Sequence, residues 1–268
     1  MTAKGAREVA QGKVAHRKAY SAPALEKGLD ILELLAREPE SIGLKGIADR
    51  LGRSVGEIFR MLAVLEQRGF VRLEAGSERY RLSMRLFRLA HWHLPVNRLT
   101  SAASGPMRRL ALACGQSCHL TMLSGSQAVV LAKHDSFRDR NFSMRIGAES
   151  PILTSCSGRI FFALADDFTR ETLLSNIALD GDDISCAKQV AALAADIKAK
   201  GCLEVASEQV EGITDIGTPV YDHNGEVAAA LIIPFLHRLH KDDSVHMKEA
   251  RTALLAAGRE ISTALGAP

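Results

Sequence analysis

The chain has 268 residues, of which 47% are apolar and 24% are charged, as in ordinary soluble globular proteins. This length is enough for two domains, each with its own hydrophobic core. The longest apolar run, Val227 to Leu236, is about half the length of a membrane-spanning helix, and residues 1–18 are too polar and basic for a signal peptide. We therefore expect a cytoplasmic protein with no membrane partner.

Positive charge is concentrated in the first third of the chain. Residues 1–94 contain 17 Lys and Arg against 11 Asp and Glu, a net charge of +6, whereas residues 95–268 contain 17 against 20, a net charge of −3. A basic first third favours an anionic partner such as DNA. A merely solvated basic surface would give the same counts, so charge alone does not decide between the two.

The cysteines predict neither disulfides nor a metal site. They are odd in number and none forms a C-x-x-C pair, which fits reduced thiols: Cys114, Cys118, Cys156, Cys186 and Cys202. His119 follows Cys118, but neighbouring side chains on a strand point to opposite faces and cannot easily share an ion. We therefore expect no metal and no cofactor.

The N-terminal segment and a first helix precede the part of the chain with the clearest pattern. Residues 1–20 carry five Lys or Arg and one Glu with little apolar content, which predicts a flexible basic arm. Pro23 suits the first turn of a helix, and four leucines follow at helical spacing: Leu25, Leu29, Leu32 and Leu35. Glu38-Pro39-Glu40 ends this helix, and residues 41–43 are expected to be a short loop.

Residues 44–69 predict two helices joined by a tight turn. The first, Leu44 to Leu51, stops at Gly52. Ser54 and Glu57 have the S-x-x-E spacing of a capping box, in which the serine oxygen accepts from the Glu57 amide and the carboxylate reaches back. The second helix then buries one stripe and ends at Gly69; the stripe is Ile58, Met61, Leu62 and Leu65.

A basic hairpin and a connecting helix come next. Residues 70–73 and 79–82 alternate around a turn that contains Gly76, and with the three helices they predict a winged helix-turn-helix over residues 21–83. Residues 84–99 are expected to be a linker helix that Leu94-Pro95 ends, followed by a linker at 95–99. Trp92, between two histidines, is interpreted as packing against its helix or another subunit rather than as part of a ligand site.

The remaining residues, 100–268, mix helices with two hairpins. Helices are expected at residues 101–113, at 154–164, at 168–175, at 188–200 and at 243–265. One hairpin joins residues 119–123 to 128–131, and the other joins 213–221 to 226–235 through a tight primed turn at Asn224-Gly225, whereas 137–152 is expected to be irregular. This pattern predicts an α+β domain in which helices flank an antiparallel sheet.

Sequence motifs of common enzymes are missing from the chain. It has no G-x-S-x-G elbow, no phosphate-binding P-loop, no G-x-G-x-x-G fingerprint and no H-E-x-x-H pair. His134 and Asp135 are adjacent, but adjacent side chains diverge and do not make a catalytic pair. We therefore do not expect an enzyme.

Five segments resemble, in the expected order, motifs of the IclR family of bacterial transcriptional regulators. They are residues 20–32, 43–48 and 53–62 in the first domain, and residues 154–159 (TSCSGR) and 212–220 (GITDIGTPV) in the second. The resemblance covers about residues 20–266. It implies an N-terminal winged helix-turn-helix domain, a C-terminal GAF-like effector-binding domain, and a homodimer or homotetramer that binds operator DNA and a small-molecule effector.

The expected DNA-binding residues lie on the second and third helices and on the hairpin. A winged helix places the first turn and exposed face of its third helix in the major groove. The candidates are Lys45, Arg53, Ser54, Glu57, Arg60, Arg79 and Arg81. Arg60 has the family's basic recognition-helix position and can hold guanine with two hydrogen bonds. The alternatives are that Glu57 only caps the helix and that the hairpin arginines are a solvated strand edge.

The resemblance places the effector between the helix start at Ser155, the loop before it and the closing strands. Free amides and the positive end of the helix dipole suit a carboxylate. The candidates are Phe142, Ser150, Cys156, Ser157, Asp215 and Ile232, and ordinary core packing or capping is the alternative for each. Ile232 and Pro234 stand where members that bind small polar acids have hydroxyl residues, so we expect an aromatic or other hydrophobic acid.

A second function remains open at this point. The chain could be a ligand-sensing or interaction protein whose DNA-binding head has lost its function. Gly56 keeps this alternative open, because a glycine inside a helix costs about 0.5–1 kcal/mol relative to alanine. Steeply salt-dependent retention on DNA would favour the regulator.

Overall fold

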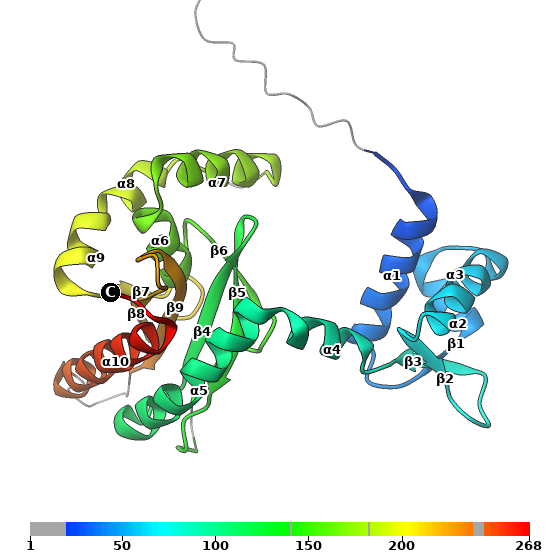
Figure 1. The fold of residues 1–268 in the computed structure, drawn as a ribbon, viewed down its shortest axis with the longest axis horizontal. Helices are drawn as coiled ribbons and strands as arrows, with labels where there is room; N and C mark the ends of the chain where they lie inside the picture. Colours follow the sequence, from blue (N-terminus) through cyan, green and yellow to red (C-terminus); the bar gives the residue numbers. More distant parts are fainter. Residues whose placement is uncertain (1–19, 140, 182, 238–243) are drawn as a thin grey trace, which may run out of the picture. The chain divides into compact units, whose positions relative to one another are not determined.

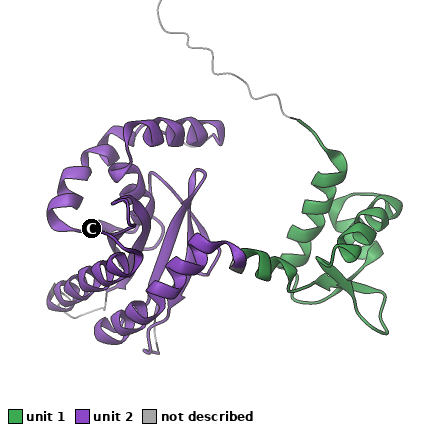
Figure 2. Ribbon diagram, viewed as in Figure 1, with its two compact units in different colours: residues 1–90 green, residues 91–268 purple. Residues whose placement is uncertain are grey.

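The computed structural model describes residues 20–139, 141–181, 183–237 and 244–268. They form two compact units that divide after Ala90 (Figure 2). Each unit has its own sheet and its own hydrophobic core. The predicted basic arm, apart from its last residue, lies outside the described residues.

The first unit packs three helices against a small antiparallel sheet (Figure 1). The helices are α1 (Pro23–Arg37), α2 (Leu44–Leu51) and α3 (Val55–Gln67), and the strands are β1 (Ile42–Gly43), β2 (Val71–Leu73) and β3 (Arg79–Leu82), in the order β1-β3-β2. Their shared core includes Ile31, Ile47, Ile58, Leu62 and Tyr80. The winged helix-turn-helix predicted from the sequence is confirmed.

Local sequence signals set both sides of the turn between α2 and α3. Gly52 has a φ of 60°, in the left-handed region, and its amide donates to the carbonyls of Ala48 and Asp49, which ends α2. Ser54 then caps α3 by accepting from the Glu57 amide, and the Glu57 carboxylate accepts from the Ser54 amide. The predicted helix stop and capping box are both present.

Two predictions for this unit are wrong in detail. α1 buries Ile31 and Leu35, whereas Leu25 and Leu29 are 63% and 49% exposed. Leu32 and Leu35 of the expected run do pack in the core, and only its first two leucines are exposed. The expected loop at residues 41–43 contains β1, which pairs with β3. A two-residue strand leaves no alternation in the sequence to recognise it by.

The predicted linker between the units is helical. α4 (Arg85–Trp92) is followed after one residue by α5 (Leu94–Cys114), so residues 95–99 belong to α5. Pro95 lies in the first turn of α5, where its fixed φ and missing amide are tolerated. The same dipeptide can therefore begin a helix as well as end one. Trp92 is 65% exposed, so it is not part of a core, and its contact with another subunit stays a prediction.

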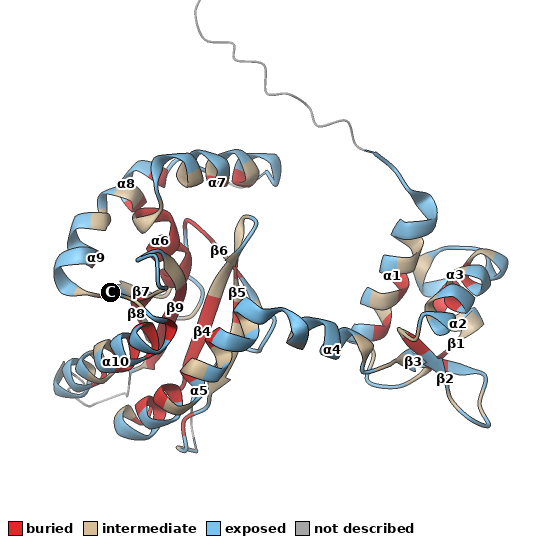
Figure 3. Ribbon diagram, viewed as in Figure 1, coloured by how far each residue is buried: buried red, intermediate tan, exposed pale blue. Residues whose placement is uncertain are grey.

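The second unit is built on a six-stranded antiparallel sheet with helices on both faces (Figures 1 and 3). The strands are β4 (Cys118–Ser124), β5 (Gln127–His134), β6 (Glu149–Pro151), β7 (Leu203–Ala206), β8 (Ile213–Tyr221) and β9 (Val227–Leu236), in the order β6-β5-β4-β9-β8-β7. α5 and α10 (Ser244–Leu265) cover one face, and α6 (Cys156–Leu164), α7 (Asp167–Leu179), α8 (Ala187–Ala192) and α9 (Ala194–Lys200) contribute to the core on the other. The predicted α+β fold is confirmed.

Alternation along the strands divides the residues between these two cores. Cys118 and Leu120 belong to the core under α5 and α10, whereas Ile232 belongs to the core under α6. His119 pairs with Ile232 across the two strands and so points to the α6 face. Cys118 and His119 therefore point away from each other, and the part of the chain that is described has no group of three possible metal ligands.

Three local features of this unit differ from the predictions. β6 lies in a stretch expected to be irregular. The helix expected at residues 188–200 is two helices that meet at Leu193. The second hairpin turns one residue earlier than expected: the Gly225 amide donates to the Asp222 carbonyl, and the Asp222 carboxylate accepts from the Asn224 amide. An aspartate that binds amides two residues further on therefore sets this turn.

The last helix of the second unit is α10. α10 carries the predicted stripe, with Ala250, Leu254 and Ile261 buried, although the expected first residue, 243, lies outside the described residues. Within the described ranges, no helix combines the length and the apolar character that crossing a membrane requires.

Candidate functional site

The start of α3 is filled by its own glutamate. One carboxylate oxygen of Glu57 accepts from the Ser54 hydroxyl at 2.8 Å and the Ser54 amide at 3.2 Å, and the other lies 2.6 Å from Lys27 Nζ. The hydrogen bond from Lys27 and those from Ser54 lower the pKa of Glu57 to about 2. Both oxygens are therefore occupied, which supports the capping role of Glu57 over a contact with a base.

Three predicted cations on α2, on α3 and in the turn between them are exposed. The side chains of Lys45, Arg53 and Arg60 have no ion pair or side-chain hydrogen bond with any described residue. They are available to an anionic partner such as a phosphate backbone. Phe59, next to Arg60, is 53% exposed and lies outside the buried stripe. It was not predicted, although an apolar residue off the stripe is a readable signal for a contact such as a thymine methyl group.

The hairpin arginines are more constrained than predicted. Arg79 and Arg81 lie two apart on β3 and are both exposed, so they share one face as expected. However, Arg79 Nε donates to the Ser41 carbonyl at 2.8 Å, and Arg81 Nε lies 3.4 Å from a Glu74 carboxylate oxygen. These contacts tie the hairpin to the segment before α2 and to its own turn, which supports a structural role.

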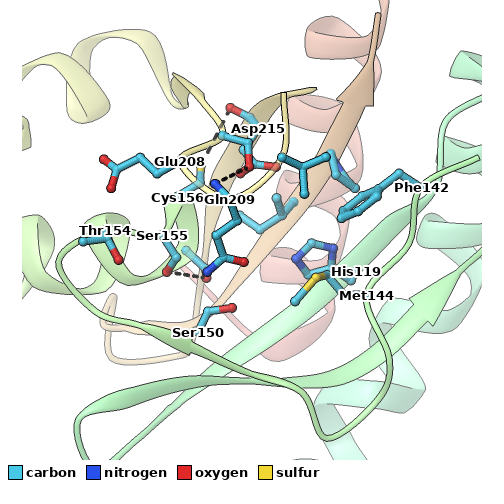
Figure 4. Close-up of a pocket in the computed structure, with 15 residues that line it drawn as sticks. His119, Phe142, Met144, Ser150, Thr154, Ser155, Cys156, Glu208, Gln209 and Asp215 are labelled. Carbon is cyan, nitrogen blue, oxygen red and sulfur yellow. Dashed lines mark hydrogen bonds between the residues drawn. The ribbon is translucent and has the colours of Figure 1, made fainter. Parts of the chain in front are cut away.

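A pocket opens beside the start of α6 in the second unit (Figure 4). Its cavity holds about 50 Å³. The lining residues are His119, Phe142, Met144, Ser150, Thr154, Ser155, Cys156, Ser157, Ser207, Glu208, Gln209, Val210, Asp215, Ile232 and Pro234. All six predicted effector-binding residues are among them, brought together from the loop before β6, β6 itself, α6, β8 and β9. Whether they bind an effector stays a prediction.

Glycines allow α6 to start this close to the sheet. A Cβ atom at Gly158 would lie 2.4 Å from the Ile152 Cα, and one at Gly217 would lie 2.9 Å from the Cys156 sulfur. Any side chain at Gly158 would therefore collide with backbone, which cannot give way as a flexible side chain can. The S-C-S-G start of α6 is thus required for close approach as well as for its cap.

The start of α6 is capped without an acidic side chain. The Ser155 hydroxyl accepts from the Gly158 amide at 3.1 Å and donates to the Pro151 carbonyl at 2.7 Å. The first turn contains no Asp or Glu. The amides of Cys156 and Ser157 belong to the helix end that has no intrahelical acceptor. Together with the helix dipole, they make this end of the pocket suitable for an anion.

The titratable groups of the pocket are shifted by burial. Burial raises the pKa of Asp215 to about 6 and lowers that of His119 to about 4. Burial also raises the pKa of the Cys156 thiol well above its usual value, so this cysteine is not an activated nucleophile. Among the residues that the structure describes, no Lys or Arg lines the pocket. A bound anion would therefore depend on amides, hydroxyls and the helix dipole.

Several lining residues were missed by sequence reasoning. His119 and Met144 lie on β4 and in the loop before β6, and residues 207–210 form the loop between β7 and β8. This loop is tied to α6, because Arg159 donates both to Glu208 and to the Leu153 carbonyl. The position of His119 on the inward face of a buried strand was a signal in the sequence. The loop carried none, since its place depends on the tertiary fold.

Comparisons with known proteins agree with both units. Residues 24–75 match the model of the IclR helix-turn-helix domain, and residues 93–263 match that of the bacterial transcriptional regulator IclR C-terminal domain. The chain is 31% identical to the glycerol operon regulatory protein of Streptomyces coelicolor, over 90% of this chain and 94% of that protein. It is 28% identical to the transcriptional regulator KdgR of Dickeya chrysanthemi, over 92% and 81%.

Solved structures show the same fold at lower identity. The IclR protein of Thermotoga maritima matches with a TM-score of 0.69 and 22% identity, covering 90% of this chain and 98% of that one. An IclR homologue of Microbacterium hydrocarbonoxydans, solved with 4-hydroxybenzoate, matches with a TM-score of 0.73 and 20% identity, covering 90% and 98%. The relatives are transcriptional regulators rather than enzymes, as the sequence predicted. The family models together cover most of the chain, which therefore belongs to the IclR family of bacterial transcriptional regulators.

Proposed function

We propose that this protein binds operator DNA through its first unit and that an organic acid in the α6 pocket changes its affinity for the operator. The observation that carries the proposal is that α6 begins at the pocket and has no acidic residue in its first turn. A ligand carboxylate would take the position that a side chain takes at the start of α3. The family of the chain supports the link between this pocket and DNA binding.

Arg60, Arg53 and Lys45 are the proposed DNA-binding cations. They are exposed and have no ion pair within the described residues, and α3 is continuous from Val55 to Gln67 despite Gly56. An intact recognition helix supports a working DNA-binding head over the alternative of a head that has lost its function. The hairpin arginines contribute mainly by holding the hairpin in place.

The proposed effector is an aromatic or other hydrophobic organic acid. Ile232 and Pro234 give the pocket an apolar floor beside the polar start of α6. The cavity of about 50 Å³ is smaller than the ~150 Å³ cavity that holds a benzene molecule in other proteins. An aromatic acid therefore requires Phe142, Met144 or the loop at 207–210 to move outward. The neighbour solved with 4-hydroxybenzoate makes such acids the first to try.

A homodimer or homotetramer would connect the pocket to DNA. α1 exposes Leu25 and Leu29, and α4 exposes Leu86 and Leu89, so both helices offer apolar surface to a second copy. Two heads held at a fixed spacing would bind paired half-sites, and an effector that favours one arrangement of the heads would change operator affinity. We also propose that the protein acts in the cytoplasm, since bacterial operator DNA lies there.

Operator binding with and without acids tests the proposal. Genome-wide mapping of bound sites would supply the operator, and fluorescence anisotropy would then measure its affinity with each of a panel of acids, including pentanoate, benzoate and 4-hydroxybenzoate. We expect a steep fall in affinity with salt and a shift of at least tenfold with one acid. Operator affinity that no acid changes, at concentrations where calorimetry also detects no binding, would refute the sensing half of the proposal.

A further inference from the structure

His119 is the unexplained polar group of the pocket. Its side chain is 7% exposed, and its Nδ1 atom is buried without a hydrogen-bond partner among the described residues. Buried polar atoms in proteins are rarely left unpaired, because an unmade hydrogen bond is costly. Figure 4 shows the ring beside Phe142 and Met144 on one side of the pocket, with the Gln209 amide on the other side. The ring therefore has an unused hydrogen-bonding atom, which a ligand reaches only when the residues around the ring move.

The sheet sets the distance from His119 to the start of α6. His119 pairs with Ile232, and Ile232 pairs with Gly217, so the three residues lie in one row across β4, β9 and β8. The Cys156 sulfur lies over Gly217, at the far end of this row. Two strand spacings separate the ends of the row by about 10 Å. His119, Ile232 and Cys156 all line the pocket, so a ligand at the α6 start can extend over Ile232 toward the His119 ring.

We propose that His119 selects the effector by hydrogen bonding to a hydroxyl group at the end of the ligand away from the α6 start. The pocket would then take a hydroxy acid, with its carboxylate at the amides of Cys156 and Ser157 and its hydroxyl at His119. This inference rests on the proposed function, in which an acid binds at α6. 4-Hydroxybenzoate and 5-hydroxypentanoate both carry a hydroxyl at the end opposite the carboxylate and are suitable probes.

The chemistry of His119 suits a hydroxyl better than a second anion. Burial keeps the ring neutral near pH 7, so it offers one donor and one acceptor, and a hydroxyl can pair with either. A second carboxylate would need a positive charge, and the described lining of the pocket contains no Lys or Arg. A ligand without the hydroxyl would leave the buried ring nitrogen unpaired, which is how polar sites reject analogues that lack a hydrogen-bonding group.

Calorimetry on matched acids tests the inference with the full-length protein. The pairs are pentanoate with 5-hydroxypentanoate, and benzoate with its 4-hydroxy derivative. We expect the hydroxylated member of at least one pair to bind roughly 10- to 100-fold more tightly to the unchanged protein. His119→Leu should remove this difference in affinity. The matched control Met144→Leu should change the affinities of both members by a similar factor, so that the difference between them remains.

The failures of the two proposals are distinguishable. If none of the acids binds, the sensing half of the proposed function is refuted and this inference with it. If the acids bind but the members of each pair bind equally, only the role of His119 is refuted. Should His119→Leu not fold, nitrogen NMR of the histidine rings in the unchanged protein gives the answer. The His119 ring signals should shift with the hydroxylated acid alone, and an equal shift with both members would overturn the inference.

Discussion

The two helices at the two candidate sites begin with the same kind of serine cap and differ in the residue three positions after it. α3 starts with Ser54 and α6 starts with Ser155, and each serine oxygen accepts the amide three residues further on. At that third position α3 has Glu57 and α6 has Gly158. Glu57 returns its carboxylate to the helix start, whereas Gly158 has no side chain and lets α6 lie against the backbone of Ile152.

This difference decides what each helix start can bind. The first is already occupied by a carboxylate, so in our proposal α3 contacts DNA through Arg60 on its exposed face. The second is open to a carboxylate from outside. The acidic side chains of the two sites also differ in pKa: hydrogen bonds lower the pKa of Glu57 to about 2, whereas burial raises that of Asp215 to about 6. An S-x-x-E helix start therefore supplies its own carboxylate, whereas an S-x-x-G start leaves that position open to the carboxylate of a ligand.

Replacing Asp215 should give the largest effect on stability. Its folded pKa of about 6 lies above its ordinary value of 3.8, so the folded state holds the proton more tightly and the free energy of unfolding falls as pH rises from about 4 to 6. Asp215→Asn cannot ionise. At 1.36 kcal/mol per pH unit it should stabilise the second unit above pH 6 by at most about 3 kcal/mol, and the advantage should disappear below pH 4.

Hydrogen exchange measured on each unit separately checks this result, with Glu57→Gln as the opposite case. The pKa of Glu57 is lowered, so its contribution is present above its ordinary value of 4.5 and is lost as pH falls toward 2. The variant should weaken the first unit at neutral pH and reduce its loss of protection in acid. Equal pH profiles for Asp215→Asn and the unchanged protein would contradict the burial of Asp215.

Removing Arg60 should have the next largest effect, on DNA affinity. A side chain that holds a base edge with two hydrogen bonds contributes about 1–3 kcal/mol, so Arg60→Ala should weaken operator binding roughly 10- to 100-fold and relax the preference at one base pair. Fluorescence anisotropy on the operator and on its single-base variants measures both. Arg37→Ala removes the same charge from the last turn of α1 and is the control. If the two variants lose affinity equally, Arg60 acts only through its charge.

Alanine at each capping serine tests the comparison of the two helix starts directly. Loss of an N-cap costs about 1 kcal/mol, so Ser54→Ala and Ser155→Ala should destabilise their own units by similar amounts. Only Ser155→Ala should also weaken binding of an acid that calorimetry has identified, because the carboxylate at the start of α3 belongs to the protein itself. Equal acid affinity in both variants would show that the α6 start does not hold the ligand.

Much of the fold was predictable because its signals are local. The stop at Gly52, the capping box at Ser54 and the start of α6 each depend on residues within four positions of one another, and all three occur as predicted. The errors have two separate causes. The two-residue strand β1 and the helical segment at 95–99 depend on partners far away in the sequence or on a proline that suits either end of a helix.

The candidate sites were predictable only to the extent that motifs mark them. The six effector residues that line one pocket could be predicted together because the family resemblance links segments that local patterns leave separate. His119 carried a signal in its place on a buried strand, whereas Gln209 joins the pocket through the placement of its loop, which the sequence does not encode. The contact of Arg79 with Ser41 was hidden for the same reason, since 38 residues separate the two. Charge and exposure indicate a cation, but only the fold shows which cations are already used.

Replacing Gly56 should give the smallest effect on stability. It also distinguishes the role of this residue in the stability of α3 from its role in DNA contact. A Cβ atom there would meet nothing within 4 Å, and the same holds for Gly28 in α1. Alanine at either position should therefore stabilise the first unit by about 0.5–1 kcal/mol, since it lowers the conformational entropy of the unfolded chain. Thermal unfolding measures this gain. If α3 approaches DNA closely along the face that includes Gly56, Gly56→Ala should also weaken operator binding, whereas Gly28→Ala should not. Equal operator affinity in the two variants would indicate that DNA contacts α3 near Arg60 rather than at its first turn.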